Sequence, residues 1–177
     1  MINLGKIIIY YGKGEGKTSA ALGRAVRAAG YGKKVIILQF MKGKETGEYR
    51  FFKKIQKFSP IKIYLCGLRI FLTKKNYARF QHLKKTKEGL ILAQNIIEDQ
   101  KCDLLVLDEI LYALKFGLLK EKDILDLLKN KGRMHIILTG GFTLSKNLKK
   151  IADQVSKITE IKHYFDEKQK AIKGLDY

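Results

Sequence analysis

A glycine-rich segment near the N-terminus contains the residue types that bind phosphate groups. Its three glycines allow a tight turn and let backbone N–H groups approach phosphate oxygens. Lys17 would neutralise a triphosphate, and the hydroxyl of Thr18 would coordinate a magnesium ion that bridges phosphate oxygens. We therefore expect a nucleoside triphosphate to bind the residues of this segment, which are Gly12, Lys13, Gly14, Glu15, Gly16, Lys17, Thr18 and Ser19.

This segment lies between an apolar run typical of a strand and a stretch with helical periodicity. Phosphates bound there would meet the positive end of the helix dipole. The strict P-loop pattern has a glycine where this chain has Tyr11, so the glycine spacing is one residue short. A glycine-rich hairpin is the alternative, but the order of strand, loop, Lys-Thr and helix favours a P-loop.

Two adjacent acidic residues follow another apolar run. Residues 104–107 are all Leu or Val, and Asp108 and Glu109 come directly after them. In a parallel sheet the carboxyl ends of the strands form the ligand-binding edge, so these carboxylates are expected on the magnesium side of the P-loop. Asp108 is the first candidate for contact with the metal or its water, with Glu109 beside it. A solvated strand end is the alternative interpretation.

The elements that would position these residues alternate between strands and helices, which indicates a parallel sheet covered on both faces. We expect strands at 7–11, 34–40, 61–65, 103–107 and 134–138. Helices are expected at 17–30, 74–98, 110–116 and 121–130, followed by one capped by Thr143 with Leu148 and Ile151 facing inward. Residues 41–59 are predicted to be irregular and to belong to a binding surface, and residues 163–177 have no clear period.

The chain of 177 residues fits one domain, since compact domains usually have roughly 100–200 residues. Its fold class is therefore predicted as α/β, a single P-loop NTPase domain of the RecA-like kind spanning residues 1–177. Cys66 and Cys102 are far apart without a histidine or second cysteine at zinc-ligand spacing, so buried thiols are expected. The apolar run 7–11 is too short for a signal peptide or membrane span, which favours a cytoplasmic protein without a membrane partner.

The charge balance is strongly basic, with 36 Lys and Arg against 17 Asp and Glu and a formal net charge of +19. Such an excess favours anionic partners, including nucleic acid, anionic lipid and phosphorylated ligands. It does not choose among them. Because the lysines are spread along the whole chain, we favour solvated faces over a specific nucleic-acid surface.

Over nearly its whole length the chain resembles the P-loop type of ATP:corrinoid adenosyltransferase. The resemblance is carried by the shortened loop and by four further motifs. These are Gln39-Phe40-Met41-Lys42-Gly43, Thr46-Gly47-Glu48, Leu107-Asp108-Glu109-Ile110 and Thr139-Gly140. The most specific motif is in the tail, where Lys162-His163-Tyr164-Phe165-Asp166 precedes Gly174-Leu175-Asp176-Tyr177. The shortened loop is a trait of that family.

The resemblance implies that cobalt(I) of a corrinoid attacks C5′ of ATP and that inorganic triphosphate leaves. ATP would be the co-substrate and Mg²⁺ the cofactor. Cobalt(I) is a strong nucleophile, so the protein needs no base and must align C5′ and stabilise the leaving group. The family also implies a homodimer, and a reductase such as a flavoprotein would supply the electron.

The corrinoid-binding residues implied by the resemblance are Leu68, Phe71, His163, Phe165 and Asp166. Relatives displace the lower ligand of cobalt with aromatic side chains, and Phe71 and Leu68 lie near the matching region. The chain contains no Trp, so the family's tryptophans near the corrinoid have no counterpart.

Two other classes share a P-loop. A P-loop ATPase acting on nucleic acid would suit the net charge but would need a group that activates water near the γ-phosphate. A nucleotide kinase would need a lid and arginines for a second phosphate group, and no such set is evident. Neither class explains the tail motif.

Overall fold

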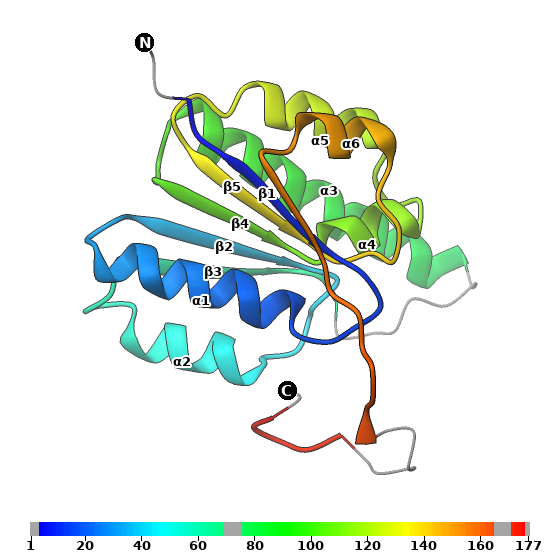
Figure 1. Cartoon of the computed structure of the whole chain (residues 1–177), viewed down its shortest axis with the longest axis horizontal. Helices are drawn as coiled ribbons and strands as arrows, with labels where there is room; N and C mark the ends of the chain where they lie inside the picture. The colour runs from blue at the N-terminus through cyan, green and yellow to red at the C-terminus, as the bar shows by residue number, and fades with distance from the viewer. Residues whose placement is uncertain (1–3, 69–75, 165–170, 176–177) are drawn as a thin grey trace.

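The computed structural model describes residues 4–68, 76–164 and 171–175. Its described strands form a six-stranded sheet in which every pairing is parallel (Figure 1). The strand order is β3-β2-β4-β5-β1-β6. The strands are β1 (Ile7–Tyr11), β2 (Val35–Phe40), β3 (Ile61–Cys66), β4 (Leu104–Asp108), β5 (His135–Thr139) and β6 (Gln154–Lys157).

The helices lie on both faces of this sheet (Figure 1). One face is covered by α1 (Lys17–Gly30) and α2 (Gly47–Ile55). The opposite face is covered by α3 (Asn76–Glu98), α4 (Ile110–Lys115), α5 (Glu121–Lys129) and α6 (Lys146–Ile151). The α/β class and the RecA-like arrangement predicted from the sequence are therefore confirmed.

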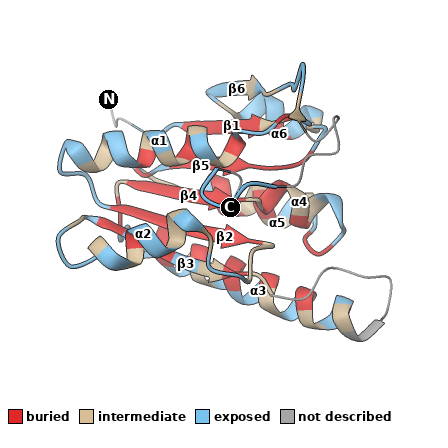
Figure 2. Cartoon of the chain, turned by 90° about the horizontal axis from the view of Figure 1, so that it is seen from below, coloured by how far each residue is buried: buried red, intermediate tan, exposed pale blue. Residues whose placement is uncertain are grey.

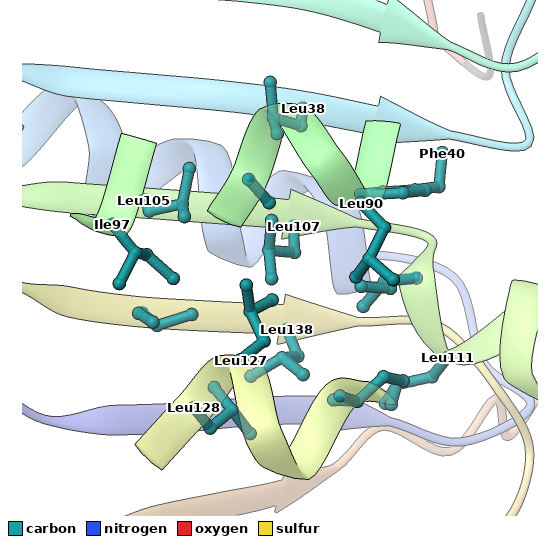
Figure 3. Packing of buried hydrophobic residues seen from close by; sticks show 14 of the residues in the cluster. Leu38, Phe40, Leu90, Ile97, Leu105, Leu107, Leu111, Leu127, Leu128 and Leu138 are labelled. Carbon is teal, nitrogen blue, oxygen red and sulfur yellow. The ribbon is translucent and has the colours of Figure 1, made fainter. Parts of the chain in front are cut away.

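The core explains why the inner strands are apolar without alternation. Strands β2 and β4 are buried at every position, because helices exclude water from both of their faces (Figure 2). On the α3 side, Leu105 and Leu107 of β4 lie among side chains from α3 and α5, such as Ile97 and Leu127 (Figure 3). This packing holds the carboxyl ends of the strands in place beneath the P-loop.

The prediction that residues 41–59 are irregular is wrong for their central part, which forms helix α2. Thr46 caps this helix, since its side chain accepts a hydrogen bond from the backbone N–H of Tyr49. Phe52 is buried against the sheet, and Tyr49 and Ile55 pack beside it. The apolar residues recur every three positions, which is a helical signal, but the helix is only nine residues long and strongly basic between them.

The region after β5 also differs from expectation. Helix α6 is capped by Ser145, whose hydroxyl accepts from the N–H of Leu148, and not by Thr143. Leu148 is buried as predicted, whereas Ile151 at the end of this short helix is exposed. Strand β6 was not predicted. It is an edge strand with the sequence Gln-Val-Ser-Lys and no buried face, so its sequence has no apolar pattern.

The two cysteines are buried, as predicted. Burial raises the pKa of the Cys66 thiol to about 11 and that of Cys102 to about 12. Both are therefore protonated and unreactive at neutral pH. No helix in the described part of the chain combines the length and the apolar character needed to cross a bilayer.

Candidate functional site

The loop between β1 and α1 turns sharply at two glycines. Gly12 and Gly16 have φ of 126° and 93°, values that side chains rarely permit. A Cβ atom on Gly12 would also collide with the carbonyl oxygen of Ile158. The N–H of Gly14 donates to the same carbonyl at 3.1 Å, so the segment after β6 braces the outside of the loop. The backbone therefore has the tight turn that the glycines predicted.

Lys17 opens helix α1 and is only 7% exposed. Its ammonium donates to the carbonyl oxygen of Gly14 at 2.6 Å, within the loop. The ammonium thus lies over the loop and lines the adjoining pocket, at the N-terminal end of α1. Lys17 can bind an anion on the loop if its ammonium exchanges the hydrogen bond to the Gly14 carbonyl for one to the anion.

Asp108 is fully buried at the end of β4 and accepts hydrogen bonds on both of its oxygens. Its Oδ1 accepts from the hydroxyl of Thr18 at 2.8 Å and from that of Thr139 at 2.7 Å. Its Oδ2 accepts from Lys42 at 3.0 Å and from Gln39 at 3.2 Å. These partners come from three segments, which are α1, β5 and the end of β2, and the parallel sheet brings them to one carboxylate at the end of β4. The arrangement keeps a buried charge fully hydrogen-bonded.

Lys42 connects Asp108 to a second carboxylate, that of Glu48 on α2. The distance from Lys42 Nζ to Glu48 Oε1 is 3.3 Å. Burial works against the charge of Lys42, but Asp108 and Glu48 outweigh it and hold the pKa of this ammonium above its ordinary value. Burial would raise the pKa of Glu48, but bonding from Thr46 and the charge of Lys42 lower it instead. Lys42 and Glu48 are therefore both charged at neutral pH.

Glu109 occupies a different environment from its neighbour. Its backbone is left-handed, with φ of 64°, and its N–H donates to the hydroxyl of Thr139 at 2.9 Å. Burial, and then the charge of Asp108, raise the pKa of the Glu109 carboxyl to about 7. A bulky residue in this backbone conformation is uncommon and is found most often at functional sites.

The pocket next to the P-loop has a volume of about 470 Å³. Loop residues 15–19 form one wall, and Lys42, Glu48 and Glu109 lie on the other side. Gly174 and Leu175 also line it, so the C-terminal tail closes part of the opening. A larger hollow of about 950 Å³ lies at the opposite edge of the sheet, where the strands begin, and contains none of the motif residues. The smaller pocket is therefore the candidate site, because the motif residues line it.

The residues expected near the corrinoid are only partly described. His163 lies against the loop, with Nε2 3.1 Å from Glu15 Oε2, and its ring packs on that of Tyr164. Leu68 follows β3 and is half-buried. Phe71, Phe165 and Asp166 lie outside the described residues.

Four polar residues of the network around Asp108 had no predicted role, namely Gln39, Lys42, Glu48 and Thr139. Gln39 and Lys42 were part of the motif at the end of β2, and Thr139 was part of the motif at the end of β5. Glu48 lies in the stretch that was expected to be irregular. Gln39, Lys42 and Thr139 share a signal, because each is a polar residue at or just after the end of an apolar strand, where parallel strands place ligand-binding groups. Glu48 lies in α2 and lacks this signal.

A phosphate-binding loop on the first strand and a buried Asp at the end of a distant parallel strand define a P-loop NTPase fold. Solved structures with this fold are similar to the chain. A KaiC-like protein of Pyrococcus horikoshii gives a TM-score of 0.54 at 20% identity, with 89% of this chain and 74% of that chain covered. The type III secretion ATPase EscN of enteropathogenic Escherichia coli gives 0.51 at 18% identity, with 89% and 42% covered.

Sequence comparison places the chain within that class. The family model of the ATP:corrinoid adenosyltransferases BtuR/CobO/CobP matches residues 3–177, and the chain belongs to this family. The corrinoid adenosyltransferase of Escherichia coli K12 is 30% identical over 98% of this chain and 86% of its own length. The CobA enzyme of Salmonella typhimurium is 32% identical, with 98% and 86% covered. The resemblance inferred from the motifs is confirmed, and the chain is an enzyme that transfers the adenosyl group of ATP to a corrinoid.

Proposed function

We propose that the 470 Å³ pocket holds the triphosphate of ATP as the leaving group while the cobalt of a corrinoid attacks C5′. The observation that carries this assignment is the bond between Thr18 of the loop and the buried Asp108. This bond joins the phosphate-binding loop to Asp108. Among the described residues near the pocket, Asp108 is the only one with a carboxylate that is fully excluded from water. Residues 12–19 would bind ATP, with the loop N–H groups directed at phosphate oxygens.

Thr18 and Asp108 would hold the magnesium ion, with Glu109 as a further oxygen ligand. The donor set fits the ion, because it consists of a hydroxyl and carboxylates, which magnesium prefers. Among the described residues no group of three His, Cys, Asp or Glu forms a protein-only cage. Magnesium is usually held by one or two carboxylates together with substrate phosphates. When bound, the ion would neutralise charge that develops on the departing triphosphate.

The chain's own residues would act by orientation and charge. Lys17 would exchange the Gly14 carbonyl for a phosphate oxygen, and the N-terminus of α1 would face the same anion. Lys17 does not need to move a proton. Cobalt(I) supplies the electron pair of the new bond, and triphosphate departs with the electron pair of the C5′–O bond. Catalysis therefore consists of alignment and of electrostatic stabilisation of the leaving group.

The corrinoid would lie against the carboxyl edge of the sheet, near the tail and the end of β3. Gly67, the neighbour of Leu68, approaches the backbone of Met41 and Lys42 so closely that a Cβ would collide there. Leu68 therefore lies beside the segment that carries Lys42, which is consistent with a corrinoid next to the nucleotide pocket. The contact of His163 with Glu15 brings the tail to the nucleotide loop. For Phe71, Phe165 and Asp166, which lie outside the described residues, a role in corrinoid binding rests on the family resemblance alone. The chain would work as a single domain and as a homodimer in the cytoplasm, with a reductase such as a flavoprotein as electron donor.

The products of turnover test the function directly. With Mg²⁺, ATP and a chemically reduced corrinoid, inorganic triphosphate should form in step with alkylated corrinoid, as measured by phosphorus NMR. Attack at the γ-phosphate would give ADP instead. Omission of the corrinoid should stop nearly all ATP consumption. If ADP and phosphate form equally well without corrinoid, the proposal is wrong.

A further inference from the structure

The ammonium of Lys42 lies among the oxygens that a divalent cation would use. It is 3.0 Å from Asp108 Oδ2, 3.3 Å from Glu48 Oε1 and 3.4 Å from Thr18 Oγ1. These groups come from β4, α2 and α1. Without a cation between them, two carboxylates would face each other in a partly dehydrated site, which is unfavourable.

Lys42 is not locked in this place by packing. Its side chain is 24% exposed, whereas that of Asp108 is fully buried. Lys42 also lines the same pocket as Lys17 and Thr18. A flexible four-carbon stem allows its ammonium to move within this pocket.

A magnesium ion and this ammonium compete for the same oxygens. Both are cations, so they repel each other when they lie beside one carboxylate in a partly dehydrated site, and magnesium carries the larger charge. Entry of the ion would therefore release Lys42 from Asp108. The nearest new anion for the released ammonium would be the triphosphate in the pocket.

We propose that Lys42 is a mobile second cation of the site. In the ligand-free enzyme its ammonium takes the place of the divalent cation beside Asp108 and Thr18, and it is held there also by Glu48. On binding of magnesium and ATP it moves to the triphosphate and, with Lys17, stabilises the leaving group. This inference rests on the proposed triphosphate site. It adds that the site exchanges one cation for another, and that Lys42 contacts the phosphates only after this exchange.

The matched pair of variants is Lys42→Met and Lys44→Met. Methionine retains the approximate length of lysine without its charge. Lys44 is an exposed lysine two positions after Lys42, and in the described part of the chain it forms no ion pair with Asp108 or Glu48. Lys42→Arg keeps the charge. If Lys42→Met fails to fold, as judged by near-ultraviolet circular dichroism, Lys42→Gln replaces it, because its amide can still donate to Asp108.

The first measurement uses Mn²⁺ as an electron-resonance probe with neither nucleotide nor corrinoid present. Loss of the competing ammonium should tighten Mn²⁺ binding by about tenfold in Lys42→Met. Lys44→Met should bind Mn²⁺ like the wild type. Unchanged or weaker Mn²⁺ binding in Lys42→Met overturns the exchange of cations.

The second measurement is the affinity for inorganic triphosphate at saturating Mg²⁺. It should fall by about tenfold in Lys42→Met and stay within about threefold of the wild type in Lys42→Arg and Lys44→Met. An unchanged affinity in Lys42→Met overturns the transfer of Lys42 to the phosphates. Because both measurements omit corrinoid, they can fail while adenosyl transfer is intact, and the product inventory above tests that function separately.

Discussion

Thr18 and Asp108 are 90 positions apart in the sequence, yet the Thr18 hydroxyl donates to Asp108 Oδ1 at 2.8 Å. The contact forms because α1 begins at the same edge of the sheet at which β4 ends. Thr139 of β5, the strand between β1 and β4, donates to the same oxygen. Asp108 is therefore oriented before any nucleotide binds, which lowers the entropic cost of assembling the site.

Lys17→Ala should weaken ATP binding by about 10- to 100-fold, since a hydrogen bond to a charged group contributes about 1.5–3 kcal/mol. The free energy of unfolding should change by only about 1 kcal/mol, because the ammonium bonds only to one loop carbonyl. Titration calorimetry and chemical denaturation measure the two quantities. Lys57→Ala is the control, because this lysine is exposed and lies outside the loop. Wild-type affinity in folded Lys17→Ala would contradict the P-loop assignment.

Asp108→Asn should lower both stability and Mg²⁺-dependent ATP binding. The amide cannot compensate the charge of Lys42, which is 3.0 Å from Oδ2. We expect a loss of about 1–3 kcal/mol in the free energy of unfolding, typical of a disrupted buried charged hydrogen bond. Asp126→Asn on α5, whose carboxylate is exposed, should leave the denaturation midpoint close to that of the wild type. Equal denaturation midpoints for the two variants would show that Asp108 is not held as described.

Glu109 should make the ligand-free enzyme less stable as the pH rises. Its pKa is raised from 4.5 to about 7 in the folded protein, so between these values the folded state binds more protons than the unfolded state. Stability from this group is therefore highest below pH 4.5, falls through the window and is constant above about pH 7. The full effect is at most about 3 kcal/mol, since one pKa unit corresponds to 1.36 kcal/mol.

Glu109→Gln removes this titration and serves as the test. The difference in unfolding free energy between the variant and the wild type should grow in favour of the variant from pH 5 to pH 8. Comparing the two proteins at each pH cancels the effect of the large net charge. A difference independent of pH would mean that Glu109 titrates at an ordinary pKa.

Binding to DNA should be weak and independent of sequence despite the net charge of +19. Such binding comes from release of counterions and should decline steeply as the salt concentration rises. Fluorescence anisotropy with two unrelated duplexes at several salt concentrations measures it. Corrinoid adenosylation should be unaffected by added DNA. A complex that survives physiological salt and stimulates ATP turnover would favour the nucleic-acid ATPase.

The sequence by itself determined the class of fold and the phosphate-binding segment. Both depend on local patterns: continuous apolar runs for strands buried on both faces, and three glycines followed by Lys17 and Thr18. Asp108 was also predictable, because it directly follows such a run. Helix α2 and strand β6 were missed, since short or edge elements depend on packing partners more than on their own periodicity.

Only the tertiary structure decided which side chains share a site with Asp108. Gln39 is adjacent to it through the register of β2 and β4. Glu48 joins the network through Lys42, because α2 packs on the same face of the sheet as α1. The raised pKa of Glu109 likewise depends on burial by segments distant in the sequence. Local patterns specify which elements form, but strand order and register set the distances between charges, and the electrostatic properties of the site follow from those distances.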